Sequence, residues 1–281
     1  MSAAPAVVLV GCGNMGRALL TGWLDRAGVV GCVTVIEPDS SQSSDLIERF
    51  DIRAYATIAD ARDVRDADVI VFAVKPQTVS DVAGQFARLA MTSPLFISIA
   101  AGVTIGALQR DLGAEAPIVR VMPNTPATVG AGVSVACANQ VATDAQHAIA
   151  QALLGAVGTV HWIEDEALMD AVTAVSGSGP AYVFLLTECL AEAGMKAGLS
   201  AELAAQLARE TVIGASLLLR ASPTPAENLR RQVTSPGGTT AAAIEVLDAA
   251  GGLRSILADA VKQAARRSRE LGGQAQPARN D

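Results

Sequence analysis

The stretch Ala6–Val10, followed by Gly11–Cys12–Gly13–Asn14–Met15–Gly16, decides the fold of this 281-residue chain. Five apolar residues predict a buried strand, and the residues after the glycines predict a helix. In this context Gly11 permits the tight turn, Gly13 lets a pyrophosphate approach the backbone, and Gly16 lets the helix pack close to the strand. The helix N-terminus offers unpaired N–H groups to phosphate. The motif therefore predicts a dinucleotide-binding fold and assigns the whole loop, Gly11–Gly16, to the cofactor.

Short apolar runs alternate with helical stretches over the first part of the chain. Most of these runs are continuous, which is typical of parallel strands covered on both faces. This order of elements predicts an α/β protein with a doubly wound, Rossmann-type sheet and right-handed crossovers. The expected strands are Ala6–Val10, Val33–Ile36, Val69–Val74, Leu95–Ala100, Ile118–Met122 and Val133–Cys137.

The character of the sequence changes near Gly158–Ile163, after which we expect helices only. Ser200 is placed to cap one of these helices. We expect the last two helices to end at Gly251–Gly252 and Gly272–Gly273, because glycine is favoured just past a helix C-terminus. The sequence therefore predicts a dinucleotide-binding domain over residues 1–164 and an all-helical domain over residues 165–281.

Composition and charge exclude several classes of partner. The net charge is −7, and Lys and Arg form no block beyond Arg266, Arg267 and Arg269, which argues against nucleic acid and anionic membranes as partners. No apolar run approaches the roughly 20 residues of a membrane span, and the first residues lack a signal-peptide pattern, so we expect a cytoplasmic protein. The four cysteines are too scattered for a zinc or disulfide framework, and no metal site is expected.

Glu37 lies 21 residues after Gly16, at the end of the second expected strand. A carboxylate at this position usually accepts hydrogen bonds from the adenosine ribose hydroxyls, which favours NADH. The 2′-phosphate of NADPH would be repelled there, although Ser40, Ser41, Ser43 and Ser44 are possible phosphate donors. A solvated loop acid is the alternative interpretation, so the choice between NADH and NADPH stays open.

Two further loops follow expected strands at the sheet edge where ligands bind. In Val74–Lys75–Pro76–Gln77, Pro76 suits the first position of a helix, while the turn backbone and Lys75 face the cofactor cleft. In Met122–Pro123–Asn124–Thr125–Pro126, two prolines stiffen the loop and would hold Asn124 towards the nicotinamide. Lys75 equally suits an exposed loop cation, and the prolines equally suit a rigid connection.

Two glycine-rich stretches interrupt the helical part. Ser176–Gly177–Ser178–Gly179–Pro180 lies inside an apolar helical pattern, where each Gly costs about 1 kcal/mol and Pro about 3 kcal/mol. This break predicts exposed backbone groups, and we assign Ser178 to the substrate site. Thr234–Ser235–Pro236–Gly237–Gly238–Thr239–Thr240 precedes a helix, where free N–H groups and the helix dipole favour an anion. A carboxylate fits better than a phosphate because the motif holds no Lys or Arg; an elaborate helix cap is the alternative.

In this order and spacing, Gly11–Gly16, Val74–Pro76, Val121–Pro126, Ser176–Tyr182 and Thr234–Thr240 resemble the motifs of the pyrroline-5-carboxylate reductases. The resemblance runs from about Val7 to Leu271. It implies reduction of 1-pyrroline-5-carboxylate to L-proline by hydride transfer from NADPH or NADH, the last step of proline biosynthesis. It also implies that the helical domain forms a homodimer, often assembled further into a decamer of five dimers.

The resemblance also implies roles for individual residues. The nicotinamide end of the cofactor would be lined by the backbone of two segments, Ala73–Val74–Lys75–Pro76 and Met122–Pro123–Asn124. The substrate carboxylate would be bound by Ser235, Gly237, Gly238 and Thr239, and the hydroxyl of Thr240 would meet the ring nitrogen as the catalytic group.

Two features depart from the family pattern. Most members prefer NADPH and have a basic or hydroxyl residue where Glu37 stands. The stretch Ser222–Asn228 is about one residue longer than usual, so we expect a different entrance to the substrate loop.

The implied reaction needs little acid–base machinery. The imine nitrogen arrives protonated, or nearly so, and positioning with charge complementarity does most of the work. The two histidines, His147 and His161, lie outside every motif and are interpreted as structural. A β-hydroxyacid dehydrogenase is the enzyme alternative, but it needs a lysine early in the second domain, and none lies among Ser176–Glu188. A non-catalytic NAD(P)-binding regulatory protein is the other alternative, and it would not need a carboxylate site at Thr234–Thr240.

Overall fold

The structure is a computed structural model that describes residues 4–50, 52–89 and 93–274. By contact, these residues form two compact units. The first unit takes the described residues up to Gly177 together with those from Ala264 onward, and the second takes Ser178–Gln263. The predicted domain boundary between residues 164 and 165 rests on the character of the sequence and stays a prediction.

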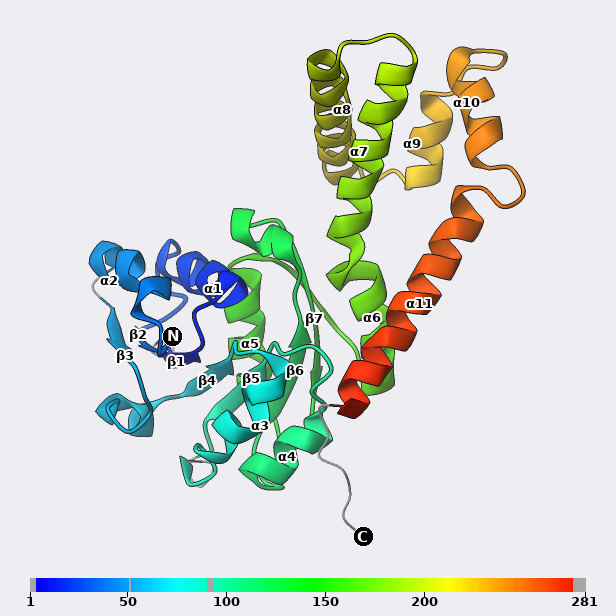
Figure 1. The fold of residues 1–281 in the computed structure, drawn as a ribbon. Helices are drawn as coiled ribbons and strands as arrows, with labels where there is room; N and C mark the ends of the chain where they lie inside the picture. Colours follow the sequence, from blue (N-terminus) through cyan, green and yellow to red (C-terminus); the bar gives the residue numbers. More distant parts are fainter. Residues whose placement is uncertain (1–3, 51, 90–92, 275–281) are drawn as a thin grey trace. The chain divides into compact units, whose positions relative to one another are not determined.

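The first unit is built on an eight-stranded sheet with the order β3-β2-β1-β4-β5-β6-β7-β8 (Figure 1). Neighbouring strands run parallel except for β6 and β7. This arrangement confirms the predicted doubly wound, Rossmann-type sheet. The strands are β1 (Ala6–Val10), β2 (Cys32–Ile36), β3 (Arg53–Tyr55), β4 (Val69–Phe72), β5 (Leu95–Ser98), β6 (Ile118–Met122), β7 (Gly132–Ala138) and β8 (Gly158–Trp162).

The antiparallel pairing of β6 with β7 differs from the all-parallel sheet that the apolar runs favour. The two strands are joined only by the residues between Met122 and Gly132, whereas a parallel crossover needs a dozen or more residues. The two edge strands, β3 and β8, were not predicted. β3 has only three residues, and β8 alternates exposed with half-buried side chains instead of forming a continuous apolar run.

Helices cover both faces of the sheet. Successive strand residues point to opposite faces, so Leu9 of β1 packs in one core cluster with Trp23, while Val10 packs in the other with Leu108. The helices of this unit are α1 (Asn14–Leu24), α2 (Ser44–Phe50), α3 (Pro76–Gly84), α4 (Ile105–Leu112), α5 (Asp144–Gly155) and α6 (Met169–Val172). Shorter helical turns are η1 (Ser40–Gln42), η2 (Arg62–Asp66), η4 (Thr125–Val129), η5 (Glu166–Leu168) and the π-helical turn η6 (Thr173–Gly177).

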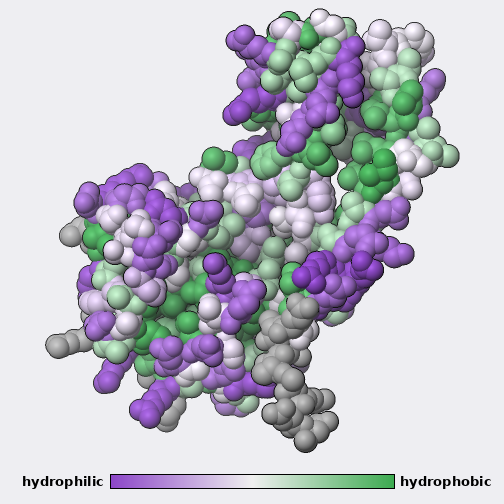
Figure 2. Space-filling model, viewed as in Figure 1, coloured by the Kyte–Doolittle hydropathy of each residue, from purple (hydrophilic) through white to green (hydrophobic). Residues whose placement is uncertain are grey.

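The second unit is helical, as expected, and the described part of the chain has no strand after β8. The predicted cap is confirmed, since Ser200 Oγ accepts the Leu203 N–H at 3.3 Å. Many large apolar side chains are exposed on these helices, which Figure 2 shows as hydrophobic patches. No helix in the described ranges is long and apolar enough to cross a membrane. The helices are α7 (Gly179–Lys196), α8 (Ala201–Ala221), α9 (Ala226–Gln232), α10 (Thr239–Leu247) and α11 (Leu253–Gln274), the last of which continues into the first unit.

Both predicted helix ends were wrong. α10 ends at Leu247, before Gly251, and α11 continues through Gly272 and Gly273 to Gln274. A Cβ on Gly272 would lie 2.9 Å from the Gly102 carbonyl oxygen. Gly272 therefore serves a close approach of two backbone segments within the first unit, and does not end the helix.

Candidate functional site

The glycine loop has the geometry expected of a dinucleotide-binding turn. Gly11 has φ +93°, and a Cβ there would lie 2.7 Å from the Ala73 carbonyl oxygen. A Cβ on Gly16 would lie 2.4 Å from the Gly11 carbonyl oxygen, so both positions are closed to a side chain. A Cβ on Gly13, in contrast, would meet no described atom within 4 Å. Gly13 therefore faces open space, as the predicted approach of a pyrophosphate requires.

The start of α1 leaves backbone donors available beside this space. Gly13 is the N-cap residue, and no side chain in the described part of the chain caps the helix. The first turn of a helix has N–H groups without intrahelical partners, and the helix dipole adds partial positive charge there. These groups fit the phosphates of a dinucleotide.

Glu37 reaches the glycine loop from the end of β2. Its Oε2 accepts the Cys12 N–H at 2.7 Å, and its Oε1 accepts the Asp39 N–H at 3.0 Å. Glu37 is half-buried, which distinguishes it from the freely solvated loop acid considered above. The carboxylate therefore stands next to the loop, where an adenosine ribose would lie.

The residues after Glu37 add negative charge and contain no Lys or Arg up to Ser44. Asp39 accepts both the N–H and the hydroxyl of Ser41, at 3.0 and 2.6 Å, and these hydrogen bonds lower its pKa. The nearby cation, Arg17 of α1, is already paired with both carboxylate oxygens of Asp45, at 2.8 and 2.6 Å. The loop thus carries two carboxylates, and the nearby Arg17 is already in an ion pair.

Cys12 is packed as an apolar residue within the loop. It is fully buried, and burial raises the pKa of its thiol to about 11, with the nearby charges of Arg17, Glu37 and Asp45 having smaller effects. Because only the thiolate is a strong nucleophile, Cys12 contributes its backbone N–H and its packing to the site.

The Ala73–Pro76 loop lies against the glycine loop. Ala73 donates its N–H to the Val10 carbonyl at 2.8 Å, which extends the pairing of β1 and β4 to the ends of the strands. Pro76 begins α3, as predicted, and Lys75 is the N-cap residue with an exposed side chain. Lys75 makes no ion pair with any described residue. Both interpretations of Lys75, cofactor contact and free surface cation, are compatible with this position.

Asn124 behaves differently from the expectation that its side chain is held towards the nicotinamide. The side chain is buried, with 8% exposed. Its Oδ1 accepts the Val133 N–H at 2.8 Å, and its Nδ2 donates to the Ser176 carbonyl oxygen at 3.3 Å. Both ends of the carboxamide are thus bonded to the protein, so the predicted contact with the cofactor would fall to the backbone of Pro123 and Asn124.

The predicted substrate loop lies in the second unit and forms the start of α10. Gly238 is the N-cap residue, and Gly237 has φ +71°, a conformation that glycine adopts without strain. The Gly238 N–H donates to the Ser235 carbonyl at 3.0 Å, whereas no side chain of the described residues caps the helix. The amides of Thr239 and Thr240 begin the first turn of α10, as an anion site requires. Thr240 itself is half-buried.

The predicted residues thus fall into two groups. The structure brings together the glycine loop, Glu37 and Ala73–Pro76, with Met122–Asn124 at the same edge of the first unit's sheet. Ser178 and Ser235–Thr240 belong to the second unit.

Sequence reasoning missed two polar partners. The role of Asp39 had a local signal, an acid two residues after Glu37. The link from Asn124 to Ser176 had none, because 52 residues separate them.

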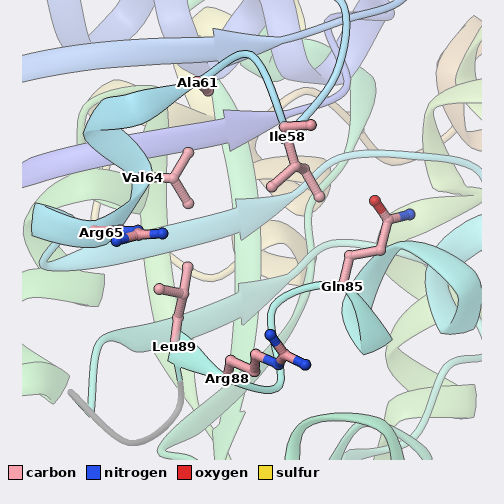
Figure 3. Close-up of a pocket in the computed structure, with 8 residues that line it drawn as sticks. Ile58, Ala61, Val64, Arg65, Gln85, Arg88 and Leu89 are labelled. Atoms are coloured by element: carbon pink, nitrogen blue, oxygen red, sulfur yellow. The ribbon is translucent and has the colours of Figure 1, made fainter.

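A pocket of about 540 Å³ opens elsewhere on the first unit (Figure 3). Ile58, Val64 and Leu89 point towards one another across it, with Arg65, Gln85 and Arg88 around them. None of the predicted site residues lines this pocket, so it is separate from the predicted dinucleotide site.

Comparison with known proteins connects these features. Residues 166–271 match the family model described as pyrroline-5-carboxylate reductase dimerisation, and residues 6–102 match the model described as NADP oxidoreductase coenzyme F420-dependent. The chain is 40% identical to the pyrroline-5-carboxylate reductase of Pseudomonas aeruginosa over 96% of its own length and 98% of that protein's. The chain belongs to the pyrroline-5-carboxylate reductase family.

Other members of the family match over similar lengths. The pyrroline-5-carboxylate reductase of Pisum sativum is 40% identical, with 93% of this chain and 94% of that protein covered. The structure of a pyrroline-5-carboxylate reductase from Coxiella burnetii superposes with a TM-score of 0.89 at 34% identity, covering 95% of this chain and 98% of that one. A Plasmodium falciparum pyrroline carboxylate reductase with NADP bound gives a TM-score of 0.81 at 31% identity, covering 97% and 100%.

Family membership bears on one of the alternatives raised by the sequence. The β-hydroxyacid dehydrogenase interpretation is set aside, and the match over residues 166–271 identifies the helical part as the region by which pyrroline-5-carboxylate reductases dimerise.

Proposed function

We propose that this chain reduces 1-pyrroline-5-carboxylate to L-proline with a reduced nicotinamide dinucleotide, as the last step of proline biosynthesis. The observation that carries the proposal is the match, over nearly the whole chain, to relatives of that name. The open space at Gly13 and the uncapped start of α1 support the dinucleotide part of the proposal. The uncapped start of α10 supports a site for the substrate carboxylate.

The residues of this chain would bind and orient the reactants. The bound dinucleotide supplies the hydride. The amides at the start of α10, with Ser235, Gly237, Gly238 and Thr239, would hold the substrate carboxylate. Thr240 would hydrogen-bond the ring nitrogen and so set which carbon faces the cofactor, consistent with catalysis mainly by positioning.

We further propose that the enzyme uses NADH better than NADPH. Glu37 stands beside the glycine loop, Asp39 adds a second carboxylate, and Arg17 is already paired with Asp45. A phosphate at this place would approach two negative groups with no unpaired Lys or Arg on the Glu37–Ser44 loop. Ribose hydroxyls, in contrast, can donate to a carboxylate.

The assembly and location are proposed on the same basis. The exposed apolar side chains of the second unit are of the kind that a dimer buries, and we propose a homodimer through residues 166–271, assembled further into a decamer. The cytoplasmic location stays a prediction from the sequence.

The test is a side-by-side assay of the purified protein with 1-pyrroline-5-carboxylate and either NADH or NADPH. We expect substrate-dependent oxidation of both, with the higher kcat/KM for NADH, and L-proline as the product. Absence of turnover with both cofactors would contradict the reductase proposal. A higher kcat/KM for NADPH would leave the reductase proposal standing and contradict the proposed preference.

A further inference from the structure

The helix that leads out of the first unit contains a π-helical turn at Thr173–Gly177, between α6 and α7. Such turns are rare and are often found at functional sites. The sequence explains part of this one. The Thr173 hydroxyl donates to the Met169 carbonyl at 2.8 Å, a back-bond that tends to bend helices. Pro180 then stands in the first turn of α7.

Pro180 leaves one carbonyl of the turn without its usual partner. In an α-helix the Ser176 carbonyl would accept the N–H of residue 180, and proline has none. The side chain of Asn124 donates to this carbonyl at 3.3 Å and to the Ser176 hydroxyl oxygen at 3.4 Å. A side-chain amide from the loop after β6 thus takes the place of a missing helix hydrogen bond.

The other end of Asn124 fixes its orientation. Oδ1 accepts the Val133 N–H at 2.8 Å, and a backbone N–H can only donate, whereas a carbonyl can only accept. If the carboxamide were turned over, its NH2 group would face the Val133 N–H, donor against donor, and its oxygen would face the Ser176 carbonyl, acceptor against acceptor. Asn124 is also the N-cap residue of η4, yet its side chain makes no capping bond, although asparagine is a favoured cap. Its side chain serves the link instead of the local turn.

A second contact joins the end of β6 to the π-helical turn. Gly177 packs on Met122, where a Cβ would lie 2.3 Å from the methionine methyl carbon. Met122, the last residue of β6, and Asn124, two residues after it, therefore both contact the turn that ends one residue before Ser178.

We propose that Asn124 is a positioning residue that joins the loop after β6 to the π-helical turn leading into α7. The inference rests on the proposed function, because that reaction requires the cofactor and the substrate to be held in fixed positions. The Met122–Asn124 segment is predicted to lie at the nicotinamide, and α7 begins the unit that holds the predicted substrate loop. Asn124 thereby acts on hydride transfer through Ser176 and the turn, without touching the reactants through its side chain.

The chain offers a matched control at the opposite end of the same strand. Asn139 accepts the Ile118 N–H at 3.0 Å and donates to the Ala116 carbonyl at 2.8 Å, so it braces the start of β6 as Asn124 braces the end. Asn124→Asp keeps the acceptor for Val133 and turns the donor towards Ser176 into a second acceptor. Asn139→Asp makes the same chemical change away from the turn. Asn124→Ser, which cannot bridge both partners and adds no charge, is the second variant if Asn124→Asp fails to fold.

Two measurements test the proposal. Hydrogen exchange on the ligand-free chain should accelerate over residues 173–182 in Asn124→Asp and Asn124→Ser, and stay unchanged there in Asn139→Asp. In the assay, kcat/KM for 1-pyrroline-5-carboxylate should fall about ten-fold or more in the Asn124 variants, since small misplacements of reactants are costly. The Kd of the dinucleotide, measured by calorimetry, should stay within about two-fold. Asn139→Asp should keep kcat/KM within about two-fold of the wild-type value, even if its Tm falls as far as that of Asn124→Asp.

A rescue experiment adds specificity. Pro180→Ala returns an N–H to the Ser176 carbonyl, so Asn124→Asp should lose less activity in that background than in the wild type. Unchanged exchange over residues 173–182, or equal losses of kcat/KM in the Asn124 and Asn139 variants, would overturn the proposal. An inactive wild type would contradict the proposed function alone, because the exchange measurement still decides the link.

Discussion

Glu37 Oε2 lies 2.7 Å from the amide nitrogen of Cys12 and accepts its N–H, joining the end of β2 to the glycine loop. A carboxylate held in this way cannot swing aside to admit a phosphate without breaking that bond. The bond and the charge are separable by mutation, since a glutamine keeps an acceptor oxygen for Cys12 and removes the charge.

We expect Glu37→Gln to raise the ratio of kcat/KM for NADPH to that for NADH about ten-fold, because removing a unit charge near a phosphate is worth about 1 kcal/mol or more. Glu37→Ser should raise the ratio in the same direction. Asp68→Asn is the control, since Asp68 accepts the Ala6 N–H at 2.8 Å at the opposite end of β1. A ratio that does not change in either Glu37 variant would show that another group decides the preference.

The two glycines of the loop should respond differently to alanine. Gly13→Ala adds a methyl group into open space, so the protein should keep its Tm within about 2 °C. The same methyl group would stand where the pyrophosphate approaches, and Kd for the dinucleotide should rise about ten-fold or more. Gly16→Ala places its Cβ 2.4 Å from the Gly11 carbonyl oxygen and should lower the Tm itself. If Gly13→Ala bound the dinucleotide as tightly as the wild type, the cofactor would have to bind somewhere other than this loop.

Thr240→Ala should lower kcat/KM for the substrate about 10-fold to 100-fold, the loss of one hydrogen bond to a charged group. The dinucleotide Kd should not change, and Thr240→Ser should restore most of the activity. Thr187→Val is a control in the same unit, since its hydroxyl donates only to the Val183 carbonyl of its own helix, at 2.8 Å. Wild-type kinetics in Thr240→Ala would remove this hydroxyl from the mechanism.

Gly272 and Gly273 form a matched pair within α11. Gly272→Ala would bring a Cβ to 2.9 Å from the Gly102 carbonyl oxygen, and we expect it to cost about 1–3 kcal/mol of stability. Gly273→Ala meets no described atom within 4 Å and should stabilise the helix by about 0.5–1 kcal/mol. Denaturant unfolding of both variants measures the difference. Equal effects would mean that α11 does not hold Gly272 against Gly102.

Cys12 gives a prediction about pH. Its folded pKa of about 11 lies above the ordinary value of 9.0, so the neutral thiol is favoured in the folded state. The contribution of this thiol to the free energy of unfolding is fully present below about pH 9 and is lost as the pH rises towards about 11. At pH 8 a maleimide should label the exposed Cys32 and leave Cys12 unlabelled until the protein is unfolded. Mass spectrometry of labelled peptides distinguishes the two thiols, and rapid labelling of Cys12 would contradict its burial.

The sequence predicted the elements that depend on local pattern. β1 and β6 match their predicted limits, and the cap of α8 at Ser200 and the start of α3 at Pro76 were found where expected. A continuous apolar run, a capping serine or a proline at a helix start influences only the few residues next to it. Such features can therefore be predicted from a single sequence. The edge strands β3 and β8 escaped because a short or half-exposed strand has no such run.

The amino-acid sequence by itself determined the fold class, the tight turn of the glycine loop and the family, because glycine spacing and the apolar pattern of strands can be read from neighbouring residues. Only the tertiary structure decided how the polar groups are used. Glu37 is bound to the Cys12 amide, Asn124 is bonded at both ends to protein, and Gly272 serves a close packing rather than a helix end. These outcomes depend on partners 25, 52 and many more residues away, and a hydrogen bond or steric contact exists only once folding brings its two partners together.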